Sequence, residues 1–303
     1  MDESGDAASA EGVAALRFRA LPGTLYVVAT PVGNLRDVTL RALDVLGSAD
    51  VIAAEDTRTT GVLLRHYGIA TRPLSLHEHN EAARATQLVA LLQEGRSVAL
   101  VSDAGTPAVS DPGAWLVRAV RDAGLPVVPV PGANAAIAAV SAAGLAAERF
   151  LFLGFLPTGA NARRELLAAI AHLPVALVIY EAPHRVRDTV THLGDALDGQ
   201  RTLVIAREIT KKFEAIARMT LAEAPKWFAA DPNHVRGEFV LLIDAAPAAQ
   251  TATGDPAIDA RRLLTALVAE LPPARAARVA AAATGLPRDV LYAQAVALKG
   301  DRG

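Results

Sequence analysis

The chain has 303 residues, of which 52% are hydrophobic and 20% are charged, and its formal net charge at pH 7 is −2. This length exceeds what one hydrophobic core usually supports, so about two domains are expected. The near-neutral charge excludes a strongly basic nucleic-acid coat, but a local basic face can still bind RNA, because charges act over about 8 Å at physiological salt. The absence of cysteine excludes disulfides, thiolate zinc sites and a cysteine nucleophile, and fits a cytoplasmic location.

The first residues, MDESGDAASAEGVAAL, are acidic and rich in alanine and serine, unlike the basic and apolar regions of a secretory signal. We interpret residues 1–20 as a disordered leader. The longest apolar stretch, 127–145, is interrupted by prolines, glycine and polar residues, which predicts a strand, a loop and a helix rather than a membrane span. No membrane partner is therefore expected.

From residue 24 to residue 144, short apolar runs alternate with segments of helical period. The predicted strands lie near 25–29, 51–54, 73–76, 98–101 and 127–130, each followed by a helix. This alternation predicts an α/β domain with a mostly parallel sheet and helices on both faces. We assign residues 21–147 to it.

Three of these predicted strands end in loops rich in proline and glycine. The first strand continues as TPVGN, the fourth as SDAGTPAVSDPG and the fifth as PGAN. Glycine allows backbone to approach a ligand closely, proline fixes the loop, and open α/β sheets bind ligands at the carboxyl ends of their strands. We therefore predict one shared crevice, although ordinary turns use the same residues. The loops contain neither the Rossmann nor the P-loop glycine motif.

A second set of apolar runs predicts strands near 151–155, 175–180, 202–207 and 238–243. We assign residues 148–244 to a second α/β domain, with a hinge near 145–150, and residues 245–257 to a small-residue linker. The helical pattern of residues 258–303, with a turn at 285–287, predicts a small helix-turn-helix-like bundle. This segment has seven basic and four acidic residues, so it is either an RNA-docking module or a charged structural cap.

Eight segments in chain order carry a resemblance to a known family: TLYVVATPVGNLRDVTLRAL, AAEDTRTT, VALVSDAGTPAVSDPG, VPVPGANAA, FLGFLP, IYEAPHR, REITKKFE and GEFVLLI. They resemble the tetrapyrrole methylase-type (class III) methyltransferases, over residues 21–299. Within that superfamily they are most similar to the branch that methylates the ribose 2′-hydroxyl of a cytidine in 16S ribosomal RNA. The resemblance implies two α/β domains of the tetrapyrrole methylase type, S-adenosyl-L-methionine bound in the cleft between them, and a homodimer.

The expected cofactor-binding residues lie on strand-end loops of both domains. Those of the first domain are Pro31, Gly33, Leu100, Asp103, Ala104, Gly105, Thr106, Pro131 and Gly132, with Ala133 or Asn134 closing the wall. From the second domain the resemblance adds Phe155, Leu156, Tyr180, Ala206, Glu238 and Phe239. For Tyr180 the alternative is a core aromatic, because such side chains bury large areas wherever they fall.

A ribose 2′-hydroxyl is a poor nucleophile at neutral pH, so a general base would increase the rate by about 10²- to 10⁴-fold. The candidate catalytic residues are Glu55, His77, Glu78, Arg207 and Lys211. Glu55 has two structural alternatives, a helix N-cap and an ion pair with Arg58. His77 and His79 lack the further ligands of a zinc site, so no metal is expected. Arg185 either pairs with Glu181 or binds a phosphate.

Three functions are compatible with these patterns. The first is an RNA 2′-O-methyltransferase whose partner is 16S ribosomal RNA, within the assembled small subunit. The second is a methyltransferase for a tetrapyrrole-like small molecule, and the third is a non-catalytic ribosome-associated binding protein. Tetrapyrrole methylases proper have Gly-Asp-Pro where this chain has Asp103–Gly105, and a porphyrinoid enzyme has no evident use for a basic bundle, so both features favour RNA.

Overall fold

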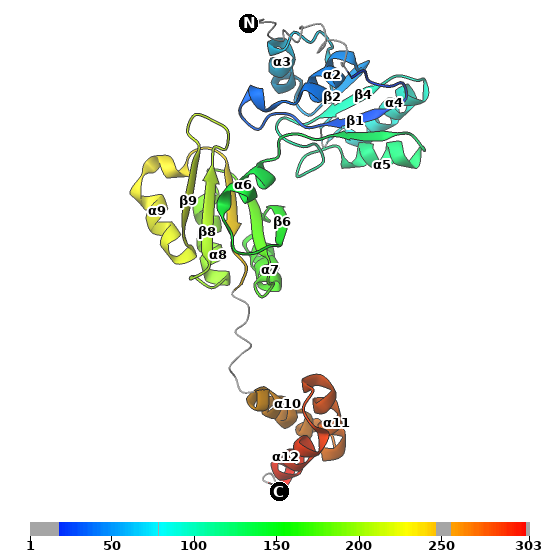
Figure 1. Cartoon of the computed structure of the whole chain (residues 1–303). Helices are drawn as coiled ribbons and strands as arrows, with labels where there is room; N and C mark the ends of the chain where they lie inside the picture. The colour runs from blue at the N-terminus through cyan, green and yellow to red at the C-terminus, as the bar shows by residue number, and fades with distance from the viewer. Residues whose placement is uncertain (1–17, 78, 247–255, 301–303) are drawn as a thin grey trace, which may run out of the picture. The chain divides into compact units, whose positions relative to one another are not determined.

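The computed structural model describes residues 18–77, 79–246 and 256–300. It divides into two compact units, the first ending at Ala245 and the second beginning at Ala246 (Figure 1). The first unit contains two five-stranded sheets and the second unit contains three helices. The two α/β domains and the helical bundle expected from the sequence are therefore present.

The first sheet is entirely parallel and has the strand order β3-β2-β4-β1-β5. Its strands are β1 (Leu25–Val28), β2 (Val51–Ala54), β3 (Pro73–Ser75), β4 (Val98–Val101) and β5 (Val127–Val130). The connecting helices are η1 (Leu35–Asp37), α2 (Leu40–Ser48), α3 (Thr57–His66), α4 (Glu81–Gln93) and α5 (Ala114–Asp122). All five predicted strands of this domain are confirmed.

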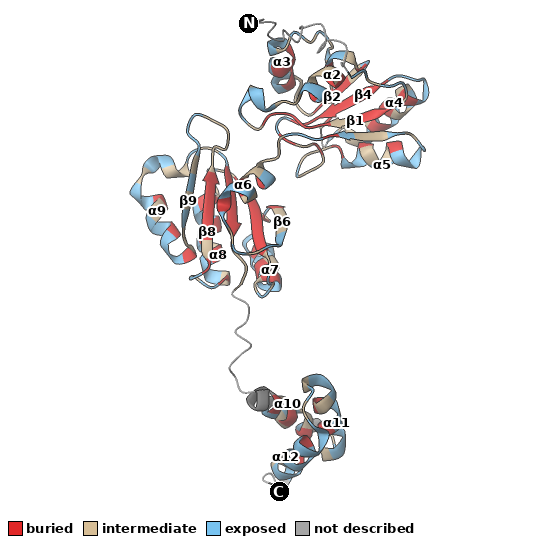
Figure 2. Ribbon diagram, viewed as in Figure 1, coloured by how far each residue is buried: buried red, intermediate tan, exposed pale blue. Residues whose placement is uncertain are grey.

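Both faces of this sheet are covered, which explains why its central strands are apolar at nearly every position. On one face α2 and α3 pack against Tyr26 and Ile52, and on the other α4 and α5 pack against Leu25 and Leu100. Figure 2 shows the central strands buried along their length. Because the strands are parallel, the loops after β1, β2 and β4 all emerge at one edge of the sheet.

The second sheet is mixed and has the order β6-β7-β10-β8-β9, in which only the β6/β7 pair is parallel. Its strands are β6 (Phe150–Phe155), β7 (Ala176–Glu181), β8 (Thr202–Arg207), β9 (Ala215–Thr220) and β10 (Phe239–Ile243). The associated helices are α6 (Ala135–Ala143), α7 (Ala160–Ile170), α8 (Val186–Ala196), η2 (Leu221–Glu223), α9 (Ala224–Ala230) and η3 (Pro232–Val235). The hairpin partner β9 is absent from the sequence-based prediction, which has four strands in this domain.

Helices α7, α8 and α9 pack on one face of the second sheet, and α6 packs on the other face. The small side chains Ala136, Ala139 and Ala143 let α6 lie close to Val178 and Leu242. Strand β5 therefore belongs to the core of the first sheet, and the next element, α6, belongs to the core of the second sheet. The chain passes from one core to the other before the hinge that the sequence predicts near 145–150.

The second unit consists of α10 (Pro256–Glu270), α11 (Pro273–Thr284) and α12 (Arg288–Gly300). Its own core contains Leu264 and Leu291 among small alanines. Gly285 ends α11 in the left-handed conformation, with φ +72°, as a helix C-cap requires. Most of the predicted linker, residues 247–255, lies outside the described residues, as does most of the predicted leader. None of the described helices is long and apolar enough to cross a membrane.

Candidate functional site

The three loops rich in proline and glycine are joined by hydrogen bonds. Backbone bonds link Thr30, after β1, to Gly105, after β4, in both directions, at 2.8 and 3.0 Å. The hydroxyl of Thr106 donates to the carbonyl of Ala133, after β5, at 3.2 Å. Gly105 has φ +81°, a conformation that glycine adopts without strain. The predicted meeting of these loops in one crevice is confirmed.

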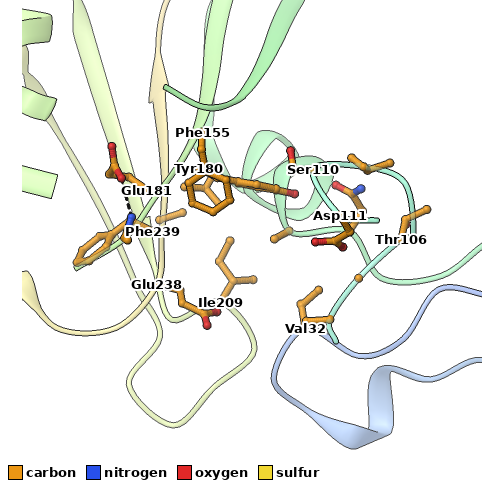
Figure 3. Close-up of a pocket in the computed structure, with 18 of the residues that line it drawn as sticks. Val32, Thr106, Ser110, Asp111, Phe155, Tyr180, Glu181, Ile209, Glu238 and Phe239 are labelled. Carbon is orange, nitrogen blue, oxygen red and sulfur yellow. Dashed lines mark hydrogen bonds between the residues drawn. The ribbon is translucent and has the colours of Figure 1, made fainter. Parts of the chain in front are cut away.

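A cavity of about 460 Å³ lies between these loops and the strand ends of the second sheet. Figure 3 shows Val32, Thr106, Ser110 and Asp111 on one side and Phe155, Tyr180 and Phe239 on the other. The complete lining is Val32, Ala104, Gly105, Thr106, Val109, Ser110, Asp111, Asn134, Ala135, Phe155, Tyr180, Glu181, Ala182, Pro183, His184, Ala206, Ile209, Lys211, Glu238, Phe239 and Val240. Its size falls within the usual range for small-molecule sites, about 300–1,000 Å³.

A second cavity, of about 380 Å³, opens beside the first. It is bounded by the loop after β1, the start of α3 and the loop after β4. Four residues line both cavities: Val32, Ala104, Lys211 and Glu238. The two cavities thus meet at these four side chains.

Carboxylates gather on the side of the first sheet. Burial first, and then the negative charges of Glu55 and Asp103, raise the pKa of Asp111 to about 6, although the nearby Ser102 hydroxyl partly lowers it. Burial and the neighbouring acids also raise the pKa of Glu55 and of Asp103. Asp103 accepts from the backbone of Asp56 at 3.0 Å. This wall therefore favours a cationic ligand, because a positive charge would relieve the repulsion.

A lysine and two glutamates form a cluster of ion pairs where the two cavities meet. The ammonium of Lys211 lies 2.9 Å from a carboxylate oxygen of Glu208 and 2.9 Å from one of Glu238. Burial alone would lower the pKa of Lys211, but the bonds to these two carboxylates outweigh it and raise the pKa. Gly33 makes room for the lysine stem, because a side chain at that position would collide with it. Lys211 is therefore a fixed cation and not a proton acceptor.

A buried acid supports the wall formed by the second sheet. Glu181 is 2% exposed and accepts hydrogen bonds from the Thr189 hydroxyl and the Ala182 amide. Its carboxylate lies 3.3 Å from the Arg185 guanidinium, which also donates to the carbonyl of Leu156 at 2.7 Å. This network ties the loop after β7 to the end of β6. Of the two roles considered for Arg185, the ion pair is the one observed.

Comparisons with known proteins agree across the chain. Residues 24–225 match the family model for tetrapyrrole (corrin/porphyrin) methylases, and residues 254–299 match the model for the RsmI C-terminal HTH domain. Ribosomal RNA small subunit methyltransferase I of Pseudomonas aeruginosa is 48% identical over 280 residues, which cover 92% of this chain and 98% of that protein. The Escherichia coli O157:H7 protein of the same name is 48% identical over 278 residues, or 92% of this chain and 96% of that one. The chain belongs to the ribosomal RNA small subunit methyltransferase I family.

Solved structures confirm the fold that this family membership implies. Uroporphyrin-III-C-methyltransferase from Thermus thermophilus aligns with a TM-score of 0.54 and 24% identity, over 73% of this chain and 94% of that one. A cobalt precorrin-4 methyltransferase aligns with a TM-score of 0.56 and 18% identity, over 73% and 95%. The chain is thus a methyltransferase with the tetrapyrrole methylase fold, and the non-catalytic alternative is disfavoured.

Most of the expected cofactor-binding residues of this methyltransferase line one of the two cavities. Those that line the larger cavity are Ala104, Gly105, Thr106, Phe155, Tyr180, Ala206, Glu238 and Phe239, and those that line the smaller cavity include Pro31, Gly33 and Asp103. Tyr180 combines both of its predicted roles, since its hydroxyl accepts from the Ala136 amide at 3.1 Å while the side chain faces the cavity.

Four expected cofactor residues lie outside these linings. Leu100 and Leu156 are buried core residues, each 1% exposed. Pro131 and Gly132 form the exposed turn after β5, where a side chain at 132 would collide with Ala29. A direct role of these four residues in cofactor binding stays a prediction.

The candidate catalytic residues separate in space. Glu55 accepts from the Asp103 amide at 3.3 Å beside the carboxylate group, and the N-cap of α3 is Asp56 rather than Glu55. His77 is bonded to Asn80, and its amide donates to the same side chain. Glu78 lies outside the described residues. Within those residues there is no cluster of three or more His, Cys, Asp or Glu side chains able to hold a metal.

The remaining two candidates, Arg207 and Lys211, follow β8 but face different partners. The Arg207 guanidinium donates to the carbonyls of Asn233 and Arg236, at 3.4 and 3.2 Å, so it joins β8 to the loop before β10. Lys211 faces both cavities. Of the four candidates that the structure describes, Lys211 and Glu55 are therefore the two placed in or beside the cleft.

Several lining residues were not among the catalytic or cofactor-binding residues expected from the sequence: Val32, Ser110, Asp111, Glu181 and Ile209. Asp111 lies inside the quoted SDPG segment, but its raised pKa depends on Glu55 and Asp103, which come from other loops. Ser110 has φ +63°, which is unusual for a residue other than glycine, and the sequence gives no sign of this backbone strain.

Proposed function

We propose that the chain uses S-adenosyl-L-methionine to methylate the ribose 2′-hydroxyl of a cytidine in 16S ribosomal RNA. The observation that carries this proposal is the cleft itself, in which the carboxylate wall of the first sheet faces the aromatic wall of the second. The relatives named ribosomal RNA small subunit methyltransferase I supply the class of substrate.

The residues of the cleft fit this cofactor. Tyr180, Phe155 and Ile209 offer apolar surface for an adenosine, and the loops at Ala104 and Thr106 offer backbone groups. The carboxylates of Asp111 and Asp103 complement a positively charged ligand. When bound, S-adenosylmethionine supplies an electrophilic methyl group on a sulfonium.

Asp111 is the residue we assign as proton acceptor. It lines the cavity, and a carboxylate with a pKa of about 6 is a better base near neutral pH than an ordinary aspartate. In this role its carboxylate would accept the proton of the ribose 2′-hydroxyl, while bound S-adenosylmethionine would supply the methyl group and leave as the neutral thioether that keeps the electron pair of the broken carbon–sulfur bond. Glu55, behind it, is a positioning residue that raises its basicity. Most of the remaining rate increase comes from holding the reactants in line.

The C-terminal unit is the second RNA contact in this proposal. Arg275 and Arg278 on α11 and Arg288 on α12 are exposed, while the apolar side chains fill the core. Arginines of this kind neutralise phosphates and position RNA without selecting the base. The substrate in this proposal is the assembled small subunit, the enzyme is a homodimer, and it acts in the cytoplasm.

The proposal is tested with purified protein, small subunits that lack the modification, and S-adenosylmethionine. Nucleoside mass spectrometry is expected to find 2′-O-methylcytidine only when all three are present. A parallel reaction with protein-free 16S RNA separates free RNA from the assembled subunit as substrate. Methylation of a base instead of the ribose would contradict the proposed function. So would the absence of methylation in both reactions, if calorimetry shows that the protein binds S-adenosylmethionine.

A further inference from the structure

The tip of the hairpin between β8 and β9, residues 208–214, carries an aromatic side chain that the cleft described above does not use. Phe213 is 63% exposed, more than any other aromatic side chain in the described residues, of which Trp115 follows at 54%. Burying an aromatic ring contributes substantial free energy, so a partner that covers the Phe213 ring would gain that stabilisation.

The hairpin tip is held rigidly. Glu208 and Thr210 have φ of +52° and +66°, in the left-handed region that residues other than glycine seldom occupy. The Thr210 amide donates to the Glu214 carboxylate, and Lys211 is paired with Glu208 and Glu238. A ring presented on such a fixed loop loses little conformational entropy when it binds.

The position of the tip relates Phe213 to the cleft. Lys211, two residues earlier, lines both cavities, and its stem passes over Gly33 on the opposite wall. Lys212 is exposed, and its ammonium lies 5.4 Å from the centre of the Phe213 ring. An exposed ring beside an exposed cation, next to the mouth of the site, matches what single-stranded nucleic acid binds: stacking for a base and charge for a phosphate.

We propose that Phe213 stacks on a base of the RNA substrate and that Lys212 contacts a neighbouring phosphate, holding the target nucleotide out of its helix with its ribose in the cleft. This inference rests on the proposed function. A nucleotide has to leave its stack before its ribose can enter a cavity between two sheets, and a ring that replaces the lost stacking lowers that cost. A dimer contact is the competing use of the same ring, and the test separates the two.

The test compares Phe213→Ala, Phe213→Leu and Phe213→Trp in methylation of small subunits. Loss of one stacked base corresponds to a decrease of about tenfold or more in kcat/KM. We expect that decrease for the alanine and leucine variants, near wild-type activity for the tryptophan variant, and unchanged affinity for S-adenosylmethionine in all three. Phe150→Ala, which removes an exposed ring at the far end of the second sheet, is the matched control and should act as wild type.

A direct readout uses the same tryptophan variant. Stacking of the introduced indole of Phe213→Trp on a base should quench its fluorescence when a short single-stranded oligocytidine is added, beyond any change in the wild type. Equal kcat/KM for wild type and Phe213→Ala would overturn the inference while leaving the proposed function intact. Wild-type activity of Phe213→Leu would also overturn the inference. Loss of the oligomeric state in Phe213→Ala, measured by light scattering, would overturn it too, because the ring would then serve a dimer contact. Failure of the wild type itself would instead count against the proposed function.

Discussion

The two walls of the cleft are built in different ways. The wall of the first sheet consists of backbone loops joined through Thr30, Gly105 and Thr106, and it carries acids whose pKa is raised. The wall of the second sheet consists of aromatic side chains at strand ends, supported from behind by the buried acid Glu181. In the proposed function, the first wall supplies the charge used in the reaction, whereas the second supplies shape and stability.

Removing the support of the second wall should lower stability strongly. In Glu181→Ala, Arg185 and Thr189 lose their buried partner, and breaking a buried pair in this way costs about 3–5 kcal/mol. Chemical denaturation at pH 7 measures the free energy of unfolding. Glu181→Gln keeps most of the hydrogen bonds, so its free energy of unfolding should fall less than that of Glu181→Ala. An alanine variant as stable as wild type would show that the network does not support this wall.

Removing the acid of the first wall should instead lower the rate. We expect Asp111→Asn to decrease kcat about 100-fold or more while the protein stays folded, because the proposed proton acceptor is lost. The wild-type rate should fall as the pH drops through about 6, where Asp111 becomes protonated, and the variant should lack that limb. Asp122→Asn, an exposed acid at the end of α5, is the matched control. A variant with wild-type rate and pH profile would exclude Asp111 as the base.

The same substitution has the opposite effect on stability. The pKa of Asp111 is raised from 3.8 to about 6 by folding, so ionisation disfavours the folded state, and stability is lost as the pH rises from about 4 to 6. The shift corresponds to at most about 3 kcal/mol, and solvent screening at this partly exposed carboxylate reduces it, so above pH 6 Asp111→Asn should raise the free energy of unfolding by roughly 1 kcal/mol. Denaturation curves at pH 8 and at pH 4 measure this, and the gain should disappear at the lower pH.

Deleting residues 255–303 tests whether the basic side chains of the C-terminal unit contribute to RNA binding. The first unit has its own cores, so cofactor affinity should be unchanged. Affinity for the small subunit should fall about tenfold, and the salt dependence of binding should flatten by roughly one unit per lost phosphate contact. Filter binding at several salt concentrations measures both. Wild-type affinity and slope in the truncated enzyme would make the C-terminal unit a structural cap.

The smallest effect is expected from one hydrogen bond in the second wall. Tyr180→Phe removes the acceptor for the Ala136 amide but keeps the ring that faces the cavity. A single neutral bond contributes about 1 kcal/mol, so cofactor affinity should weaken only a few-fold. Calorimetric titration measures it. A loss of a hundredfold or more would mean that the hydroxyl contacts the cofactor itself.

Much of the fold was predictable because the buried strands are short apolar runs between turn residues. Strand β9 was not predicted, because AIARMT is an edge strand with no buried residue and so lacks the apolar pattern of a buried strand. The loops of the first sheet that line the cavities were predictable from proline and glycine. The raised pKa of Asp111 was not predictable, because it depends on the charges of Glu55 and Asp103, which come near Asp111 only in the folded protein.

The most direct measurement is nucleoside mass spectrometry of 16S ribosomal RNA from a strain lacking this protein. We predict that one 2′-O-methylcytidine is missing from that RNA, that the wild-type gene restores it, and that the Asp111→Asn gene restores little of it. A strain without the protein whose 16S RNA keeps every 2′-O-methylated cytidine would contradict the proposed activity.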